Sequence, residues 1–385
     1  MKKLWLIIVI LIVILSECLL LFRPKNTENV LACAKEIKGL DRKSTSLSLI
    51  MVGDALIHRG VYYDAQTNMK DELGYVKYDF SNMFTYIKDI IKPYDLKFYN
   101  QETVIGGKNL GLSNYPLFNS PDEIGLNLID VGFNIVNLAT NHTIDKGKEG
   151  ATYSANFWQS KEGIYAVGSY RSFDERNKAR IEEKNGITYS VLGYTTYTNG
   201  LKISSDYSYL VNVYDPETVK KDIEAVRNKV DLLIVSMHWG TEYTNTPTQA
   251  QRDIAKYLSS LGVDVIIGHH PHVVESIEYV DNTLVIYSLG NFISAQDGTN
   301  KRTGLIAALT VKKNTVNGTS KIKITDVKSD LLWTHQVGYK GFKVIPYAYL
   351  TDDILKDHDN LYNKYKAYIN PSNDSRIQVG FITKE

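Results

Sequence analysis

Short apolar runs rich in β-branched residues alternate with longer amphipathic stretches along the chain after residue 45. The runs predict buried strands, and the stretches between them predict helices. The predicted strands cover residues 46–52, 96–99, 135–138, 188–193, 232–237 and 263–267. Strands that alternate with helices in this way are typical of an α/β fold.

Helix start and stop signals support this interpretation. Asp215-Pro216 supplies an N-cap and a proline at the first helical position before residues 219–230. Thr246-Pro247 opens the next predicted helix, and Gly262 ends it.

The C-terminal part continues the pattern. Residues 321–327 alternate as a strand does, and Asn317-Gly318 is a hairpin turn signal. Residues 352–368 predict a polar helix. We therefore expect residues 311–385 to complete the main domain, which is predicted over residues 46–310.

The N-terminus carries a membrane signal. Lys2 and Lys3 precede an apolar run over residues 4–22, long enough at about 1.5 Å per residue to cross a hydrocarbon core of about 30 Å. Residues 1–22 thus predict a single transmembrane anchor whose positive flank stays inside, with residues 23–45 as a tether. The alternative is a cleaved export signal with Ala32 and Ala34 at the cleavage site. Both alternatives place the rest of the chain outside the cell.

Composition excludes several classes. The chain has 385 residues with 44 Lys plus Arg and 43 Asp plus Glu, a net charge of +1, which argues against a nucleic-acid binder. The two cysteines, Cys18 and Cys33, cannot form a disulfide framework or a cysteine-rich zinc site. The sequence has no G-x-S-x-G, no G-x-x-x-x-G-K-[ST] and no G-x-G-x-x-G, which disfavours a serine hydrolase and nucleotide-binding enzymes.

Metal-competent side chains follow the predicted strands, where the strand ends of an α/β fold line one crevice. The sequence GHHPH at residues 268–272 is the most specific of these segments. The candidate ligands are Asp54, Glu102, Asn141, His238, His270 and His272. Carboxylate, amide oxygen and imidazole suit Mn²⁺, Zn²⁺ or Fe²⁺. Such a site can hold two metals about 4 Å apart that activate water, while a nearby imidazole protonates the leaving group.

These segments resemble a known family. MVGDALIHRG, FYNQETVIGG, NLATNHTIDKG, VSMHWGTEY, IIGHHPHVVESIE and IYSLGNFI are similar, in this order, to the CapA family of poly-γ-glutamate capsule synthesis, within the calcineurin-like metallophosphoesterase superfamily. The resemblance implies a four-layer α/β/β/α sandwich of the metallo-dependent phosphatase type with a dimetal site, here preceded by one transmembrane helix.

The resemblance also implies roles. Asp54 corresponds to the first-strand ligand, Glu102 to the bridging carboxylate and His142 to the general acid. Asn141, His238, His270 and His272 correspond to the remaining ligands, with one histidine of the H-x-H pair on each metal. The residues implied to lie beside the site are His269, Asn291, Phe292, Tyr194, Tyr197 and Asn199. For Tyr194, Tyr197 and Asn199 the alternative is packing in the core and at the rim, which the residues themselves favour.

The sequence departs from the superfamily at two places. The usual Asp-x-His is Asp54-Ala55-Leu56, so one metal position lacks a histidine and is expected to be weaker, with His58 as a candidate replacement. Where the family usually has NLEG, residues 100–103 read NQET, which changes the loop but keeps the carboxylate. Arg59 and Arg252 are candidates for contacting an anionic polymer.

Two functions follow as hypotheses. The first is a membrane-anchored, extracytoplasmic metal-dependent hydrolase in the synthesis or processing of capsule poly-γ-glutamate, cleaving a phosphoester or an amide. The second is a non-catalytic accessory subunit that binds the polyanion or supports a membrane synthase or exporter.

Overall fold

The computed structural model describes residues 42–383. The predicted anchor over residues 1–22 and residues 23–41 of the predicted tether lie outside this part. Among the helices within residues 42–383, none has the length and apolarity needed to cross a membrane.

The chain divides into two units. The described part of the smaller unit comprises residues 42–44 and 314–320, where Ser44 Oγ donates to Asn314 Oδ1 at 2.9 Å. Asn317 and Gly318 both have positive φ, 49° and 79°, as a two-residue hairpin turn requires. The turn predicted from Asn317-Gly318 is therefore confirmed. The larger unit, residues 45–313 and 321–385, contains all of the predicted site residues.

A nine-stranded sheet forms one layer of the larger unit, in the order β16-β15-β14-β1-β4-β5-β6, with β13 paired to β1 and β17 to β15. The strand β1 pairs in parallel with β4, as β4 does with β5 and β5 with β6. The strands are β1 (Arg42–Leu56), β4 (Leu96–Gln101), β5 (Ile135–Asn137), β6 (Tyr165–Val167), β13 (Asn291–Ser294), β14 (Thr303–Val316), β15 (Thr319–Val337), β16 (Lys340–Pro346) and β17 (Ile377–Val379).

A six-stranded sheet forms the next layer, in the order β11-β12-β10-β9-β8-β7. Its central pairs, β8 with β9, β9 with β10 and β10 with β12, are parallel. The strands are β7 (Glu182–Lys184), β8 (Ile187–Thr195), β9 (Leu232–His238), β10 (Val265–His269), β11 (Ile277–Val280) and β12 (Thr283–Ile286); β2 (Gln66–Lys70) and β3 (Val76–Tyr78) form a separate hairpin.

Apolar side chains from both sheets form a shared core. Strand alternation turns Met51 and Phe98 of the first sheet toward Ile234 and Ile267 of the second. Trp158 and Leu128 cover the outer face of the first sheet, and Ile223 covers the outer face of the second.

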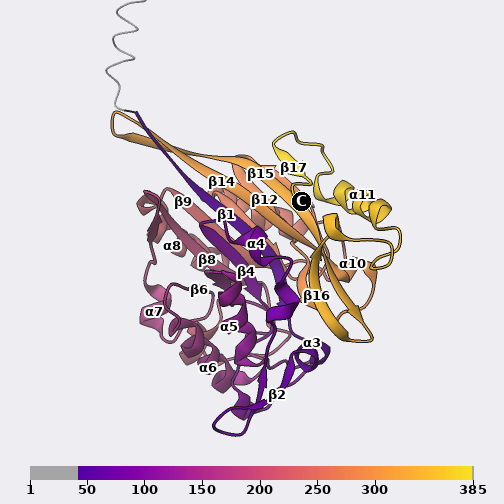
Figure 1. Ribbon diagram of the computed structural model, residues 1–385. Helices are drawn as coiled ribbons and strands as arrows, with labels where there is room; N and C mark the ends of the chain where they lie inside the picture. Colours follow the sequence, from indigo (N-terminus) through magenta and orange to yellow (C-terminus); the bar gives the residue numbers. More distant parts are fainter. Residues whose placement is uncertain (1–41, 384–385) are drawn as a thin grey trace, which may run out of the picture. The chain divides into compact units, whose positions relative to one another are not determined.

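Helices thus pack on the outer face of each sheet, in the layered order that the resemblance implied. Figure 1 shows α5 and α6 beside the first sheet and α8 beside β9. The α-helices are α3 (Arg59–Asp64), α4 (Lys88–Ile91), α5 (Asp122–Val131), α6 (Gly147–Gln159), α7 (Phe173–Asn177), α8 (Pro216–Val226), α9 (Gln249–Ser260), α10 (Thr299–Arg302) and α11 (His358–Ile369). The α/β expectation is confirmed.

The first strand differs from its prediction at both ends. It begins at Arg42, so its start lies inside the segment expected to be a tether, and it ends at Leu56 rather than at residue 52. The strand continues because its pairing with β13 resumes after an irregularity between Asp54 and Ala55. Asp54 therefore lies within the strand and not after it. The C-terminal helix begins at His358, later than the predicted residue 352.

Candidate metal centre

The ligands predicted from the sequence converge, and all are buried. Glu102, His270 and His272 place ligand atoms within 4.8 Å of one another. His272 Nε2 lies 3.5 Å from Glu102 Oε1, and His272 Nδ1 lies 3.5 Å from Asp54 Oδ2. His238 Nε2 lies 3.8 Å from Glu102 Oε1 and 2.9 Å from Asn141 Oδ1.

Both sheets contribute to this cluster. Asp54 and Glu102 lie in β1 and directly after β4 of the nine-stranded sheet, and Asn141 lies in the loop after β5. His238 ends β9 of the six-stranded sheet, and the histidines of GHHPH lie at and after the end of β10. Because neighbouring strands in each sheet are parallel, their carboxyl ends meet at one edge and bring these residues together.

A ladder of asparagines holds the Asp54 carboxylate. The register pairs Asp54 with Asn100 and Asn100 with Asn137 across three parallel strands. Asn100 Nδ2 donates to Asp54 Oδ1 at 2.8 Å, and Asn137 Nδ2 donates to Asn100 Oδ1 at 2.7 Å. Asn100 and Asn137 are not among the site residues predicted from the sequence, although their places at the ends of predicted strands were a usable signal.

The backbone around the GHHPH histidines is strained. His270 has φ of 97° and His272 has φ of 59°, in the left-handed region that non-glycine residues rarely adopt. The N–H of His270 donates to Asp54 Oδ2 at 3.3 Å. Strain of this kind is concentrated at functional sites, where the surroundings hold the chain in place. Here it turns both imidazoles toward the same carboxylates.

Several buried polar atoms in the cluster have no hydrogen-bond partner. Both oxygens of Glu102 and the Nδ1 atom of His270 are unpartnered among the described residues. A buried carboxylate without a hydrogen-bond partner is costly, and a bound metal cation would compensate for this cost. The donor set of carboxylate, amide oxygen and imidazole fits a divalent metal ion, because these groups are the common ligands of such ions.

The ionisable groups of the cluster shift one another's pKa values. Burial raises the pKa of Glu102 well above its usual range, and the Asp54 carboxylate adds to this effect. Burial also opposes ionisation of Asp54, but the neighbouring histidines, above all His269 and His272, hold its pKa well below the usual value. Burial lowers the pKa of His238 well below the ordinary value and that of His270 to about 3, so both rings are neutral and able to coordinate a metal. For His272 the two carboxylates outweigh burial and raise the pKa to about 9.

His142 lies beside the centre and is held by Asp145, which is not among the residues predicted from the sequence. His142 Nδ1 donates to Asp145 Oδ2 at 2.7 Å, which leaves Nε2 as the other ring nitrogen. The N–H of Phe118 also donates to Asp145 Oδ2 at 2.7 Å and fixes the carboxylate. Such a pair orients an imidazole for proton transfer. The available signal in the sequence was the position of Asp145, a carboxylate three residues after His142.

Four further predicted neighbours contact the cluster. His272 Nδ1 lies 3.0 Å from Asn291 Oδ1, and Tyr197 Oη lies 2.5 Å from His270 Nε2. Asn141 Nδ2 donates to Asn199 Oδ1 at 3.2 Å. His269 is fully buried, stacks on Phe98 and places Nδ1 3.4 Å from Asp54 Oδ1. It therefore supports Asp54 from the core.

Two predicted neighbours lie elsewhere, and their placement is corrected. Tyr194 packs in the outer core and donates to Asp222 Oδ2 at 2.7 Å on α8. Phe292 stacks on Phe84 in the core on the other side of its sheet. Both placements follow from strand alternation. Tyr194 precedes Thr195 and Phe292 follows Asn291, so each aromatic side chain faces the side of its sheet opposite to that of its neighbour.

The predicted alternative ligand His58 contacts backbone. Its Nδ1 lies 3.1 Å from the carbonyl oxygen of Leu56 and accepts from the N–H of Ala295 at 3.3 Å. Its ring packs edge-on against Phe118, and burial lowers its pKa to about 4. The ring of His58 is therefore part of the wall of the site, and its contacts are with backbone atoms and Phe118.

The two candidate arginines differ. Arg59 is exposed next to His58, and its N–H donates to Asn114 Oδ1 at 2.9 Å, while its guanidinium remains near Tyr63. Arg252 is paired with Glu278 at 2.9 Å, so its charge is already compensated and it is not a free cation for a polymer.

Comparison with known proteins identifies the family of this chain. Residues 48–296 match the model of the family described as bacterial capsule synthesis protein PGA_cap. The PGA biosynthesis protein CapA of Bacillus subtilis (strain 168) is 30% identical over 284 residues, which cover 73% of this chain and 71% of that protein. The capsule biosynthesis protein CapA of Bacillus anthracis is 26% identical over 282 residues, which cover 71% of this chain and 66% of that protein.

Among solved structures, a 5'-nucleotidase from Candida albicans SC5314 is 14% identical, with a TM-score of 0.40, over 68% of this chain and 46% of the other. That likeness is too distant to bear on the chemistry. The family model, in contrast, matches well over half of the chain, and the matched range of residues 48–296 contains the positions of all the candidate ligands. The chain belongs to the bacterial capsule synthesis protein PGA_cap family.

Proposed function

We propose that this chain is a metal-dependent hydrolase of the metallophosphatase type that acts in the synthesis or processing of capsule poly-γ-glutamate. The observation that carries the proposal is the buried, unpartnered Glu102 carboxylate between His238 and His272, with the His142–Asp145 pair beside it. A structural role does not explain a buried carboxylate without a hydrogen bond.

The chemistry follows from what each side chain can do. Asp54, Glu102, Asn141, His238, His270 and His272 would hold the metal. A divalent ion bound there supplies a Lewis acid and lowers the pKa of a coordinated water to near neutrality. His142, oriented by Asp145, presents Nε2 to hand a proton to the leaving group. Burial of the cluster excludes bulk water and strengthens these interactions.

The substrate bond is an amide of poly-γ-glutamate or a phosphoester, since both cleavages need the same attack on a polarised centre and the same proton donor. The relatives' names refer to capsule and PGA synthesis, which favours the polymer as the partner.

The test uses purified full-length protein with added Mn²⁺ and two substrates, a chromogenic phosphodiester and a γ-linked glutamyl oligomer. We expect metal-dependent turnover of one of them and its loss in His142→Gln. His358→Gln is the matched control, because His358 lies outside the site on α11. Absence of metal-dependent turnover on both substrates would favour the accessory function, in which the protein binds the polyanion or supports a membrane synthase or exporter.

We further propose that the catalytic part is outside the cell and anchored by the N-terminal segment. The support is the sequence of residues 1–22, with two lysines before an apolar run. Protease added to intact cells should remove the domain, whereas it should not do so if the domain faces the cytoplasm.

A further inference from the structure

A cavity of about 430 Å³ lies against the loop that borders the metal centre. Thr198 and Ile144 line it, and their chain neighbours Asn199 and Asp145 contact His142. The metal centre and the cavity therefore share a wall, although none of the predicted ligands lines the cavity.

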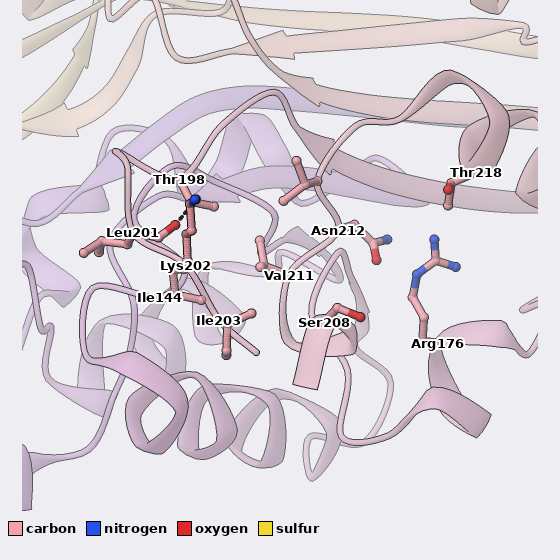
Figure 2. A pocket seen from close by; sticks show the side chains of 11 residues that line it. Ile144, Arg176, Thr198, Leu201, Lys202, Ile203, Ser208, Val211, Asn212 and Thr218 are labelled. Carbon is pink, nitrogen blue, oxygen red and sulfur yellow. Dashed lines mark hydrogen bonds between the residues drawn. The ribbon is translucent and has the colours of Figure 1, made fainter. Parts of the chain in front are cut away.

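The cavity has two polar ends and an apolar wall. Figure 2 shows Thr198, Leu201 and Lys202 gathered at one side, and Asn212, Arg176 and Thr218 at the other. Val211 lies between these two groups, and Ile144 and Ile203 lie beside Lys202. An occupant with polar groups separated by an apolar spacer matches this order.

The charge of the cavity favours an anion. Lys202 is exposed and has no hydrogen bond or ion pair with another residue of the described chain. No carboxylate is among the lining residues within residues 42–383. The second cation, Arg176, is held by Asp222 through contacts of 3.0 and 2.6 Å, so Lys202 is the group left to pair with a ligand carboxylate.

An unpartnered acceptor at the other end calls for a hydrogen-bond donor. Asn212 is only 5% exposed; its Nδ2 donates to the carbonyl oxygen of Gly193 at 3.1 Å, but its Oδ1 is buried with no partner. Because an orphaned buried acceptor is costly, a ligand N–H that reaches it gains a full hydrogen bond. Arg176 and Asn212 also line a second cavity of about 480 Å³, so a ligand has room to extend beyond Asn212.

We propose that this cavity is a binding subsite for a γ-glutamyl segment of the polymer, with a side carboxylate on Lys202, the methylene groups on Ile144 and Val211, and a main-chain amide N–H on Asn212 Oδ1. The proposal rests on the proposed function for its substrate class. It adds a place where the polymer is held while an adjacent bond reaches the metal centre.

The test measures binding rather than turnover. Affinity of the full-length protein for a γ-linked glutamyl hexamer is determined by calorimetry, with Glu102→Gln as a background in which metal chemistry is disabled. We expect Lys202→Gln to weaken binding by about tenfold, as loss of a charged hydrogen bond does. Ser208→Trp, which fills the cavity from an exposed lining position, should abolish binding.

Lys220→Gln is the matched control, because Lys220 is an exposed lysine on α8 that does not line the cavity. A polyacrylate of equal charge, which lacks amide N–H groups, should bind more weakly than the hexamer. Equal affinity of polyacrylate, or unchanged affinity in both Lys202→Gln and Ser208→Trp, overturns the subsite. Loss of turnover in Glu102→Gln with binding retained supports the subsite separately from the hydrolase proposal.

Discussion

The Asp145 carboxylate accepts from two donors at once, the ring of His142 and the backbone N–H of Phe118, each at 2.7 Å. The backbone bond fixes the carboxylate, and the carboxylate in turn fixes the tautomer of the imidazole. The orientation of His142 is therefore decided by a residue in the loop before α5, far from it in the sequence.

Asp145→Asn should lower kcat by about a hundredfold or more, because an amide cannot stabilise an imidazolium and does not enforce the correct tautomer. The bound metal should be unchanged, since Asp145 is not among the clustered ligand atoms. Steady-state kinetics and elemental analysis of the same preparation check both statements. Equal kcat in the variant and the wild type would contradict the role of Asp145.

Glu102→Gln should remove most of the bound metal, because its carboxylate lies between His238 and His272. A metal ion present at a hundred times its dissociation constant stabilises the folded state by about 2.7 kcal/mol. Mn²⁺ should therefore raise the melting temperature of the wild type and not that of the variant. In metal-free buffer the variant should melt no lower than the wild type, because both Glu102 oxygens lack hydrogen-bond partners. A lower melting temperature of the metal-free variant would indicate a structural role instead.

Glu275 predicts a pH dependence of stability. Burial raises the pKa of Glu275 from 4.5 to about 8, although Gln251 Nε2 donates to Oε2 at 2.7 Å. Between these values the folded state keeps a proton that the unfolded state has lost, so the free energy of unfolding falls as the pH rises through the window. Glu275→Gln should flatten this dependence and stabilise the protein by up to a few kcal/mol above pH 8. Urea denaturation at pH 5 and pH 8.5 measures it, with the exposed Glu224→Gln as control.

Gly53→Ala should disrupt the site through the backbone. A Cβ at Gly53 would lie 1.8 Å from the carbonyl oxygen of Gly290, the atom that accepts from the N–H of Asp54 at 2.9 Å. The strands must separate, so we expect loss of metal and a destabilisation of more than about 2 kcal/mol. Gly163→Ala, which faces open space at φ of 74°, should cost only about 1 kcal/mol. Similar denaturation midpoints for the two variants would be inconsistent with this account.

The sequence was sufficient to predict the strands that carry the ligands, because buried parallel strands are continuous apolar runs and their ends share one edge. The sequence was insufficient where the face of the sheet on which a side chain lies decides whether the residue reaches the site. Tyr194 and Phe292 lie one residue from positions that face the site, and a period of two turns each into an outer core. Asn100 and Asn137 escaped notice because their bonds to Asp54 and to each other depend on register, which a single strand does not reveal.

The division of the ligands between the two sheets has a consequence for maturation. Asp54 and Glu102 come with one sheet, and His238 and His272 with the other. A chain with only one of the two sheets formed would present half a coordination shell and would bind an ion only weakly. Retention of metal would thus indicate that the two sheets have packed together, which makes the ion content a practical assay of correct folding for any variant.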